Sequence, residues 1–327
     1  MKKNIAIIWG GYSSEIIVSE KSMQGIYSFM NKDLYNIYKV KIAADSWTAD
    51  ISGQEYPIDK NDFSIQTPTG NIQIDFAYIT IHGTPGEDGR LQGYLDMLHI
   101  PYSTCSMMAS ALTFNKFVCN NFLKNFGFNV AKSVYLSRDT KYDIGQITEY
   151  LELPVFVKPN TGGSSFATTK VKTRNDMQKA IDAAFEEASD VIIESFISGR
   201  EVTCGCYKTK NKEVLLPLTE VITQNEFFDY NAKYMGEVEE ITPARLSEEL
   251  TSEIQALTSK IYDLVDAKGI IRADFIISDN VPYLLEVNTT PGMTATSFIP
   301  QQVRAANLNM TDVLSEIIEN EFLKNIK

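Results

Sequence analysis

Hydrophobic and polar positions follow two different rhythms along the chain. Residues 5–9 form an uninterrupted apolar run, residues 76–81 are apolar except for Thr80, and a glycine-containing turn follows each segment. Runs of this kind are typical of parallel strands that are buried on both faces. Apolar residues at helical spacing over 14–30 predict a helix between the two strands. These segments together predict an open α/β arrangement for the N-terminal part of the chain.

The remaining pattern predicts a mixture of helices and strands. Helices are predicted over 106–126, 175–188, 246–267 and 310–325, and strands at 133–136, 155–158 and 191–194. The polar stretch 43–70 predicts peripheral strands and loops, and strands dominate after residue 200 up to the third helix. Boundaries near residues 103 and 196 divide the chain into three parts, 1–103, 104–196 and 197–327.

The richest chemistry lies in a strand pair at 270–288, where a short turn separates two mostly apolar strands. Side chains alternate between the faces of a strand, so Arg272 and Asp274 share one face, and Glu286 and Asn288 share one face of the next strand. Pairing as a hairpin would bring two carboxylates, an amide and a guanidinium onto one patch. Oxygen ligands of this kind suit Mg²⁺, and the arginine suits a phosphoryl group or an oxyanion. The alternative is an edge hairpin with a solvated polar face.

Three further segments place charged residues at the ends of predicted strands. Glu15 follows a glycine turn at a helix start, which either binds an anion or complements the helix dipole. The loop 82–89 contains His82, three glycines and two acids, and it serves either a site or a tight helix cap. Lys158 precedes the Gly/Ser-rich loop 161–165, which forms either a lid over phosphates or a flexible linker.

Two lysines outside these segments have less specific surroundings. Aromatic residues alternate with Lys233 over 227–234, and they either cover a ligand or form a packed surface loop. Lys116 lies in the predicted helix 106–126 among apolar neighbours, where a lysine ordinarily lays its stem along apolar surface.

Composition narrows the possible partners. The 327 residues contain 30 Lys plus Arg and 42 Asp plus Glu, which gives a net charge of −12. This charge disfavours nucleic acid or an anionic membrane as the main partner, although a small anion needs only a local positive site. No apolar run approaches the length of a transmembrane helix. Four cysteines without disulfide or zinc spacing indicate reduced thiols in a cytoplasmic protein.

Six motifs in order resemble a known family. They are the glycine turn with Glu15, H-G-T-P-G-E-D-G at 82–89, the lysine before Gly-Ser-Ser, D-Y-N-A-K-Y at 229–234, R-A-D at 272–274 and E-V-N-T-T-P-G-M at 286–293. Together they resemble the D-alanine–D-alanine ligases of the ATP-grasp superfamily, over nearly the whole chain. The resemblance implies a three-domain ATP-grasp α/β (α+β) fold, with ATP held between the central and C-terminal domains.

The resemblance also implies the reaction and its setting. Two D-alanines and ATP would give D-alanyl-D-alanine, ADP and phosphate, with an acyl phosphate as the intermediate. The dipeptide is a peptidoglycan precursor, so the protein would be bacterial and cytoplasmic, and the family tends to form homodimers. Mg²⁺, or Mn²⁺ in its place, would act as two ions bridged by the phosphates.

The matched positions carry implied roles in nucleotide and metal binding. Lys116, Lys158 and Lys233 would contact ATP, as would Glu194 and Glu201 at the adenine and ribose. The metal ligands would be Asp274, Glu286 and Asn288.

Further matched positions would serve the amino-acid substrates. Arg272 and the N–H of Gly292 would stabilise an oxyanion. Glu15 would pair with the ammonium of the first D-alanine near His82, and Ser297 would bind the carboxylate of the second. Ser164 and Tyr234 would join with Glu15 in closing two loops over the site.

Two departures from the family pattern bear on the nucleotide. Ser195 stands where a lysine that touches adenine is common, so a hydrogen bond and a charge are lost while Phe196 can still pack on the base. The loop 162–167 lacks the usual acid at its first position and the usual V-G at its end, which alters the stiffness of the lid.

Three alternatives stay open at this point. One is a ligase that makes D-alanyl-D-serine or D-alanyl-D-lactate; Tyr234 favours a dipeptide over the ester, but D-serine is harder to exclude. Another is a catalytically silent nucleotide-binding regulatory protein, which the intact metal ligands and Arg272 disfavour. The last is an ATP-grasp ligase for other carboxylates, which Glu15 and the loop at His82 disfavour.

Overall fold

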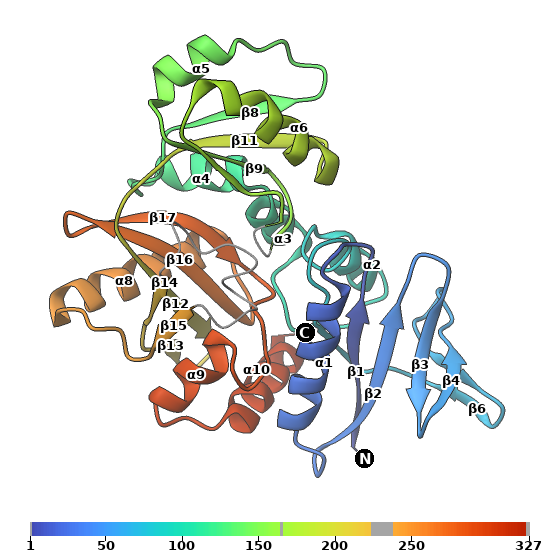
Figure 1. Ribbon diagram of the computed structural model, residues 1–327. Coiled ribbons are helices and arrows are strands. Elements are labelled where there is room, and N and C mark those ends of the chain that lie inside the picture. Colours follow the sequence, from blue (N-terminus) through green and yellow to red (C-terminus); the bar gives the residue numbers. More distant parts are fainter. Residues whose placement is uncertain (1, 164–165, 224–237, 325–327) are drawn as a thin grey trace.

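In the part of the chain that the structure describes, three larger sheets succeed one another along the sequence (Figure 1). The computed structural model describes residues 2–163, 166–223 and 238–324. The first sheet contains five strands, the second four and the third six, and a short two-stranded ladder is added to the first part. Within the described residues, no helix combines the length and the apolar character needed to cross a bilayer.

The N-terminal sheet has the order β4-β3-β2-β1-β7. β1 (Lys3–Gly10) pairs in parallel with β2 (Tyr35–Ile42) and β7 (Phe76–Ile79), while the two strands beyond β2 pair antiparallel. The remaining elements here are α1 (Ile16–Phe29), β3 (Trp47–Ile51), β4 (Gln54–Pro57), β5 (Ile65–Thr67), β6 (Gly70–Ile72) and α2 (Arg90–Met97). Ile5, Ile7 and Ile8 are fully buried, which confirms the predicted buried parallel strand.

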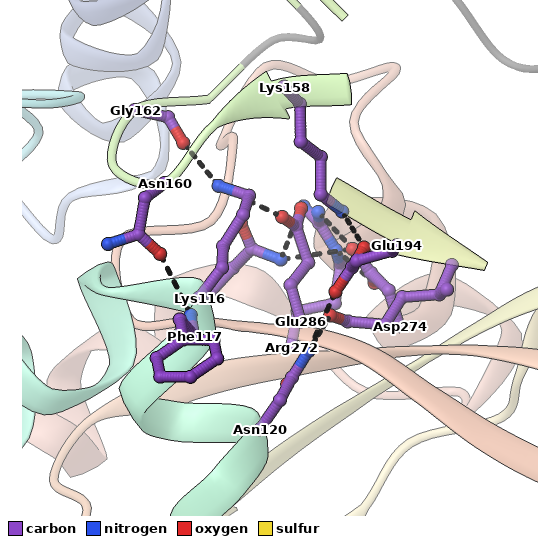
Figure 2. A network of polar contacts seen from close by, with 12 residues as sticks. Lys116, Phe117, Asn120, Lys158, Asn160, Gly162, Glu194, Arg272, Asp274 and Glu286 are labelled. Carbon is purple, nitrogen blue, oxygen red and sulfur yellow. Dashed lines mark hydrogen bonds and ion pairs between the residues drawn. The ribbon is translucent and has the colours of Figure 1, made fainter. Parts of the chain in front are cut away.

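The second sheet is antiparallel, with the order β10-β9-β11-β8. Its elements are β8 (Ser133–Ser137), α5 (Ile144–Leu151), β9 (Val155–Pro159), β10 (Thr169–Val171), a 3₁₀ turn (Arg174–Asp176), α6 (Met177–Glu187) and β11 (Asp190–Ser195). Val155, Val157 and Ile193 pack with side chains of α5 and α6 in one apolar cluster. The opposite face, here called the inner face, carries Lys158 and Glu194, whose ion pair lies near α4 (Figure 2).

The single helix predicted over 106–126 is wrong. The segment forms α3 (Met107–Phe114) and α4 (Lys116–Lys124), with Asn115 between them in an extended conformation. The Asn115 side chain accepts a hydrogen bond from the N–H of Val118 at 2.9 Å, so it caps a new helix. Lys116 therefore begins a helix, where sequence reasoning had placed it in the middle of one.

The third sheet has the order β15-β14-β12-β16-β17, and β13 pairs with β12. Its elements and those that follow are β12 (Arg200–Lys208), β13 (Glu213–Leu215), β14 (Thr219–Thr223), β15 (Val238–Ile241), α8 (Glu248–Leu264), β16 (Ile270–Ser278), β17 (Val281–Asn288), α9 (Phe298–Ala305) and α10 (Met310–Lys324). β16 and β17 form the predicted hairpin, in which Arg272 faces Asn288 and Asp274 faces Glu286. α9 was not predicted, because Pro300 interrupts its pattern; a proline in the first helical turn is tolerated.

Buried apolar clusters show how the sheets are joined. One cluster unites Ile5 and Met23 of the N-terminal part with Ile299 of α9 and Leu314 of α10. A second unites α3 and α4 with the third sheet, through side chains such as Cys119. Two further clusters each stay within one part of the chain: one lies in the N-terminal part and includes Ile8 and Val40, and the other lies in the four-stranded sheet and its helices.

A close backbone contact fixes the first part of the chain against the third. A Cβ atom built on Gly269 would collide with the carbonyl oxygen of Ser103, and the φ of Gly269 is +64°. Gly127 has a φ of +89° but open space around it. Alanine substitutions at the two glycines therefore allow the cost of a positive φ to be separated from the cost of a steric clash.

We predict that Gly269→Ala lowers the free energy of unfolding well beyond the roughly 1 kcal/mol expected from an unfavourable φ alone. Gly127→Ala, the matched control, should lose only that smaller amount. Urea denaturation followed by circular dichroism measures both. Equal losses in the two variants would show that the contact with Ser103 yields without cost.

Candidate active site

Arg272 and Asp274 form the centre of a buried polar network (Figure 2). The Nε and Nη2 of Arg272 donate to the two carboxylate oxygens of Asp274, both at 2.7 Å. The Asn288 amide donates to Asp274 at 3.0 Å and to Glu286 at 3.4 Å. Burial opposes the charged form of Arg272, but the Asp274 carboxylate outweighs it and raises the pKa of the guanidinium above its ordinary value. The arginine is therefore held as a fixed cation.

Lys116 links this network to the loop after β9. Its Nζ lies 3.5 Å from the Glu286 carboxylate and donates to the carbonyl of Gly162 at 2.6 Å. Asn160, fully buried, accepts the N–H of Lys116 on its carbonyl at 3.0 Å and the N–H of Phe117 on its side chain at 2.9 Å. The first turn of α4 is thus tied to the strand that carries Lys158 (Figure 2).

Lys158 and Glu194 form a second buried ion pair, 2.6 Å apart, on the inner face of the four-stranded sheet. Burial lowers the pKa of Lys158, but the charge of Glu194 and a hydrogen bond to it, with smaller contributions from Glu286 and Glu201, raise it above its ordinary value. Asn120 of α4 donates to Glu194 at 3.4 Å and to the carbonyl of Leu285 in β17 at 3.2 Å. Asn120 therefore joins the inner face to the third sheet.

The N-terminal part adds an acidic corner. Glu15 is buried at the start of α1, and a Cβ on Gly163 would lie 3.0 Å from its carboxylate, so the glycine loop passes directly beside it. Glu87 accepts the N–H of Gly83 at 2.7 Å. Burial and then the charge of Glu15 raise the pKa of Glu87 to about 8. His82, also buried, has its Nε2 3.0 Å from the hydroxyl of Ser22.

The loop between β17 and α9 completes the surroundings. Ser297 accepts the N–H of Thr294 at 3.1 Å and shares a hydrogen bond with its hydroxyl at 2.8 Å. A Cβ on Gly292 would lie 3.0 Å from the Ser297 hydroxyl, so Gly292 and Ser297 are immediate neighbours. The carbonyl of Met293 rests against Gly25 of α1, where a side chain would not fit. The loop is thereby held between the first and third parts.

Two family models match almost the whole chain. The model described as "D-ala D-ala ligase N-terminus" matches residues 4–105, and the one described as "D-ala D-ala ligase C-terminus" matches residues 122–319. A curated D-alanine--D-alanine ligase from Parabacteroides distasonis is 60% identical over 329 residues, which cover 100% of this chain and 99% of that protein.

The chain belongs to the D-alanine–D-alanine ligase family.

Solved structures agree with this membership. The VanG D-Ala:D-Ser ligase from Enterococcus faecalis superposes with a TM-score of 0.87 at 28% identity, covering 98% of this chain and 100% of that one. A D-alanine--D-alanine ligase from Bacillus anthracis complexed with ATP gives a TM-score of 0.78 at 26% identity, covering 98% of each chain. The predicted ATP-grasp α/β fold is confirmed, and so is the prediction of a ligase over a silent regulatory protein.

The structure brings seven of the residues matched to the ligase family into two neighbouring networks. One contains Arg272, Asp274, Glu286, Asn288 and Lys116, and the other contains Lys158 and Glu194. Glu201 faces Ile276 across the β12–β16 ladder, and its charge acts on both Arg272 and Lys158. Ser164, Lys233 and Tyr234 lie outside the described residues.

Sequence reasoning missed Asn120, Asn160 and Glu87. The two asparagines contact backbone groups and a carboxylate that are distant in the sequence, so no local pattern predicts these contacts. Glu87 was visible as an acid in the 82–89 loop, but only the fold places it beside Glu15. Ser195 turns away from the site, because its hydroxyl donates to the carbonyl of Leu151 at 2.8 Å.

The raised pKa of Glu87 predicts that the free energy of unfolding falls as the pH rises. Its carboxyl has an ordinary pKa of 4.5 and one of about 8 in the folded protein. The folded state thus retains a proton that the unfolded chain releases, and this contribution to stability is lost as the pH rises from about 4.5 to about 8. Glu87→Gln should therefore flatten the decline of unfolding free energy over this range, measured by urea denaturation at a series of pH values.

Glu20→Gln provides the control, since Glu20 is an exposed glutamate of α1. This variant should decline with pH in parallel with the unmodified protein. If Glu87→Gln also runs parallel, Glu87 does not carry the proton.

Proposed function

We propose that this protein joins two D-alanines into D-alanyl-D-alanine, converting ATP to ADP and phosphate through a D-alanyl phosphate, for peptidoglycan precursor synthesis. The observation that carries the proposal is the buried network around Arg272, Asp274 and Glu286. It gathers a fixed guanidinium, two carboxylates and an amide beside Lys116, in a chain 60% identical to a curated ligase of this name.

The two lysine–glutamate pairs would hold ATP. Lys116 and Lys158 would bind the phosphates, and Glu194 and Glu201 would hold the adenine and ribose. Each lysine is already fixed beside a carboxylate, at 3.5 and 2.6 Å. Because these side chains are already held in place, binding of ATP would cost less side-chain entropy. Lys233 would contact ATP from the aromatic segment.

The residues between the lysines fit Mg²⁺ or Mn²⁺. Asp274, Glu286 and Asn288 present oxygen atoms within one hydrogen-bonded group. No three Asp, Glu, His or Cys side chains in the described part of the chain could hold a metal alone. Mg²⁺ commonly takes one or two carboxylates and completes its shell with phosphate oxygens, so this set suits a pair of ions bound together with ATP. Such ions would supply charge neutralisation at the transferring phosphoryl group.

The amino-acid substrates would lie between the acidic corner and the loop after β17. Glu15 would pair with the ammonium of the first D-alanine, with His82 close by. Ser297 would bind the carboxylate of the second. Placing the two ends this way directs the amine of the second substrate towards the carbonyl carbon of the first.

Two steps follow from these positions. A carboxylate oxygen of the first D-alanine attacks the γ-phosphorus of ATP, the bond to the β,γ-bridging oxygen breaks, and ADP leaves. The amine of the second D-alanine, neutral after its ammonium has released a proton to solvent, then attacks the acyl carbon. Phosphate departs with the bonding electrons of the acyl C–O bond and takes up the extra proton of the new amide nitrogen. Arg272 and the N–H of Gly292 would stabilise the negative oxygen formed in between.

Closure would protect the acyl phosphate from water. Ser164 and Tyr234 would join Glu15 in linking the glycine loop and the aromatic segment over the substrates. The approach of Gly163 to Glu15 supports the first half of this link, since a Cβ built on Gly163 would lie 3.0 Å from the Glu15 carboxylate.

The proposal extends to the setting of the protein. The three sheets fall within 1–103, 104–196 and 197–327, which supports these ranges as domains, although α3 and α4 share a core with the third sheet. We also assign the protein to the cytoplasm, as a homodimer that has neither nucleic acid nor membrane as a partner.

Phosphate release from Mg²⁺-ATP tests the reaction directly. D-alanine alone should support release and give D-alanyl-D-alanine, identified by mass, whereas L-alanine should not. A product formed only when D-serine or D-lactate is added would instead make this a variant ligase. This outcome is worth testing because the VanG D-Ala:D-Ser ligase is 28% identical to this chain.

Glu286→Gln should weaken ATP binding about tenfold or more in Mg²⁺, because it removes one of two carboxylate ligands. Without divalent metal, the affinity should change much less. Isothermal calorimetry under both conditions makes the comparison, and Glu249→Gln, an exposed residue of α8, is the control. Unchanged affinity in Mg²⁺ would remove Glu286 from the metal set.

A further inference from the structure

Three side chains form one row across the inner face of the four-stranded sheet. Lys170 of β10 pairs with Phe156 of β9, and Phe156 pairs with Glu194 of β11. Residues directly opposite each other on adjacent strands project to the same side. Lys158 lies two positions from Phe156 and so shares this face, where it binds Glu194. The row therefore runs from a cation through an aromatic ring to the carboxylate assigned to the nucleotide.

Lys170 rests on a second aromatic ring. Its ammonium lies 3.6 Å from the ring centroid of Phe196, and the rings of Phe196 and Phe156 are 5.8 Å apart with an angle of 58° between their planes. Lys170 makes no hydrogen bond to an acceptor in the described ranges, so its only partner there is the ring. An ammonium over a ring is attracted by the negative face of the ring, yet its N–H groups form no hydrogen bond to an oxygen acceptor there.

Two neighbouring side chains that could donate a hydrogen bond to a ligand on this face already have partners. The hydroxyl of Ser195 faces the end of α5, where it donates to the carbonyl of Leu151. Lys158, the other lysine on this face, is paired with Glu194 at 2.6 Å. Of these three side-chain donors, Lys170 is therefore the one that could meet a flat ligand along Phe156 and Phe196 without giving up an oxygen acceptor.

We propose that Lys170 is the base-recognition residue of this protein: it leaves the ring of Phe196 and donates a hydrogen bond to N7 of a purine nucleoside triphosphate. This rests on the proposed function, in which Glu194 lies at the adenine end of ATP. N7 is an acceptor in adenine and guanine alike. Lys170 thus selects purines as a class and supplies a charged donor that Ser195 does not.

Binding of ATP and of 7-deaza-ATP, in which a carbon replaces N7, separates this role from a general attraction to phosphates. Calorimetry in Mg²⁺ without D-alanine should show that the unmodified protein binds 7-deaza-ATP about tenfold more weakly than ATP, as expected for loss of a charge-assisted hydrogen bond. Lys170→Met keeps the length of the side chain but removes the donor. It should bind ATP about tenfold more weakly and bind the two nucleotides equally.

Lys132→Met is the matched control, since Lys132 also lies over a ring, that of Tyr150 of α5, at 5.9 Å. It should retain both the affinity for ATP and the preference over 7-deaza-ATP. The proposal is overturned if Lys170→Met still prefers ATP, or if the unmodified protein binds both nucleotides equally. Because binding is measured without amino acid, a failure of the D-alanine reaction leaves this result interpretable.

Discussion

The buried pair of Arg272 and Asp274 is the interaction on which the site depends. Removing two charges from water is costly, and a buried pair is tolerated only with good geometry and further hydrogen bonds. Both conditions are met, because two bonds of 2.7 Å join the pair and Asn288 donates to the same carboxylate. The hairpin register, with Arg272 opposite Asn288, makes this arrangement possible. The site is therefore a product of strand pairing as much as of residue type.

The two lysines assigned to the phosphates are paired in the same way. Lys116 is paired with Glu286 and Lys158 with Glu194, so both hold an acidic partner in the absence of nucleotide. A triphosphate that binds these two lysines would have to replace those partners. In a chain of net charge −12, such pairing keeps a local positive group in place against the overall field.

The sequence predicted elements whose signals are local and missed those that depend on tertiary contacts. Apolar runs located β1 and β7, and alternation along 270–288 placed Arg272 and Asp274 on one face. The break at Asn115 was missed because apolar spacing continues across it, although asparagine before a lysine is a recognisable cap. Asn120 and Asn160 could not be found this way, since the partners of Asn120 lie on β11 and β17 and those of Asn160 on α4 and β11. The roles of the individual side chains came from resemblance, and the spacing of residues alone would have left them open.

The distribution of apolar clusters has a mechanical consequence. The first and third sheets share one core through α10, and α3 and α4 belong to the core of the third, whereas the apolar cluster of the four-stranded sheet contains only residues of its own part of the chain. We therefore expect the four-stranded sheet and its helices to move as one body against the rest. Such a displacement would separate Glu194 from Asn120, Lys116 from Gly162 and the ring of Phe117 from that of Tyr135, without dividing any of the large apolar clusters. Opening would cost these few contacts, so we expect a hinge rather than partial unfolding to admit a nucleotide.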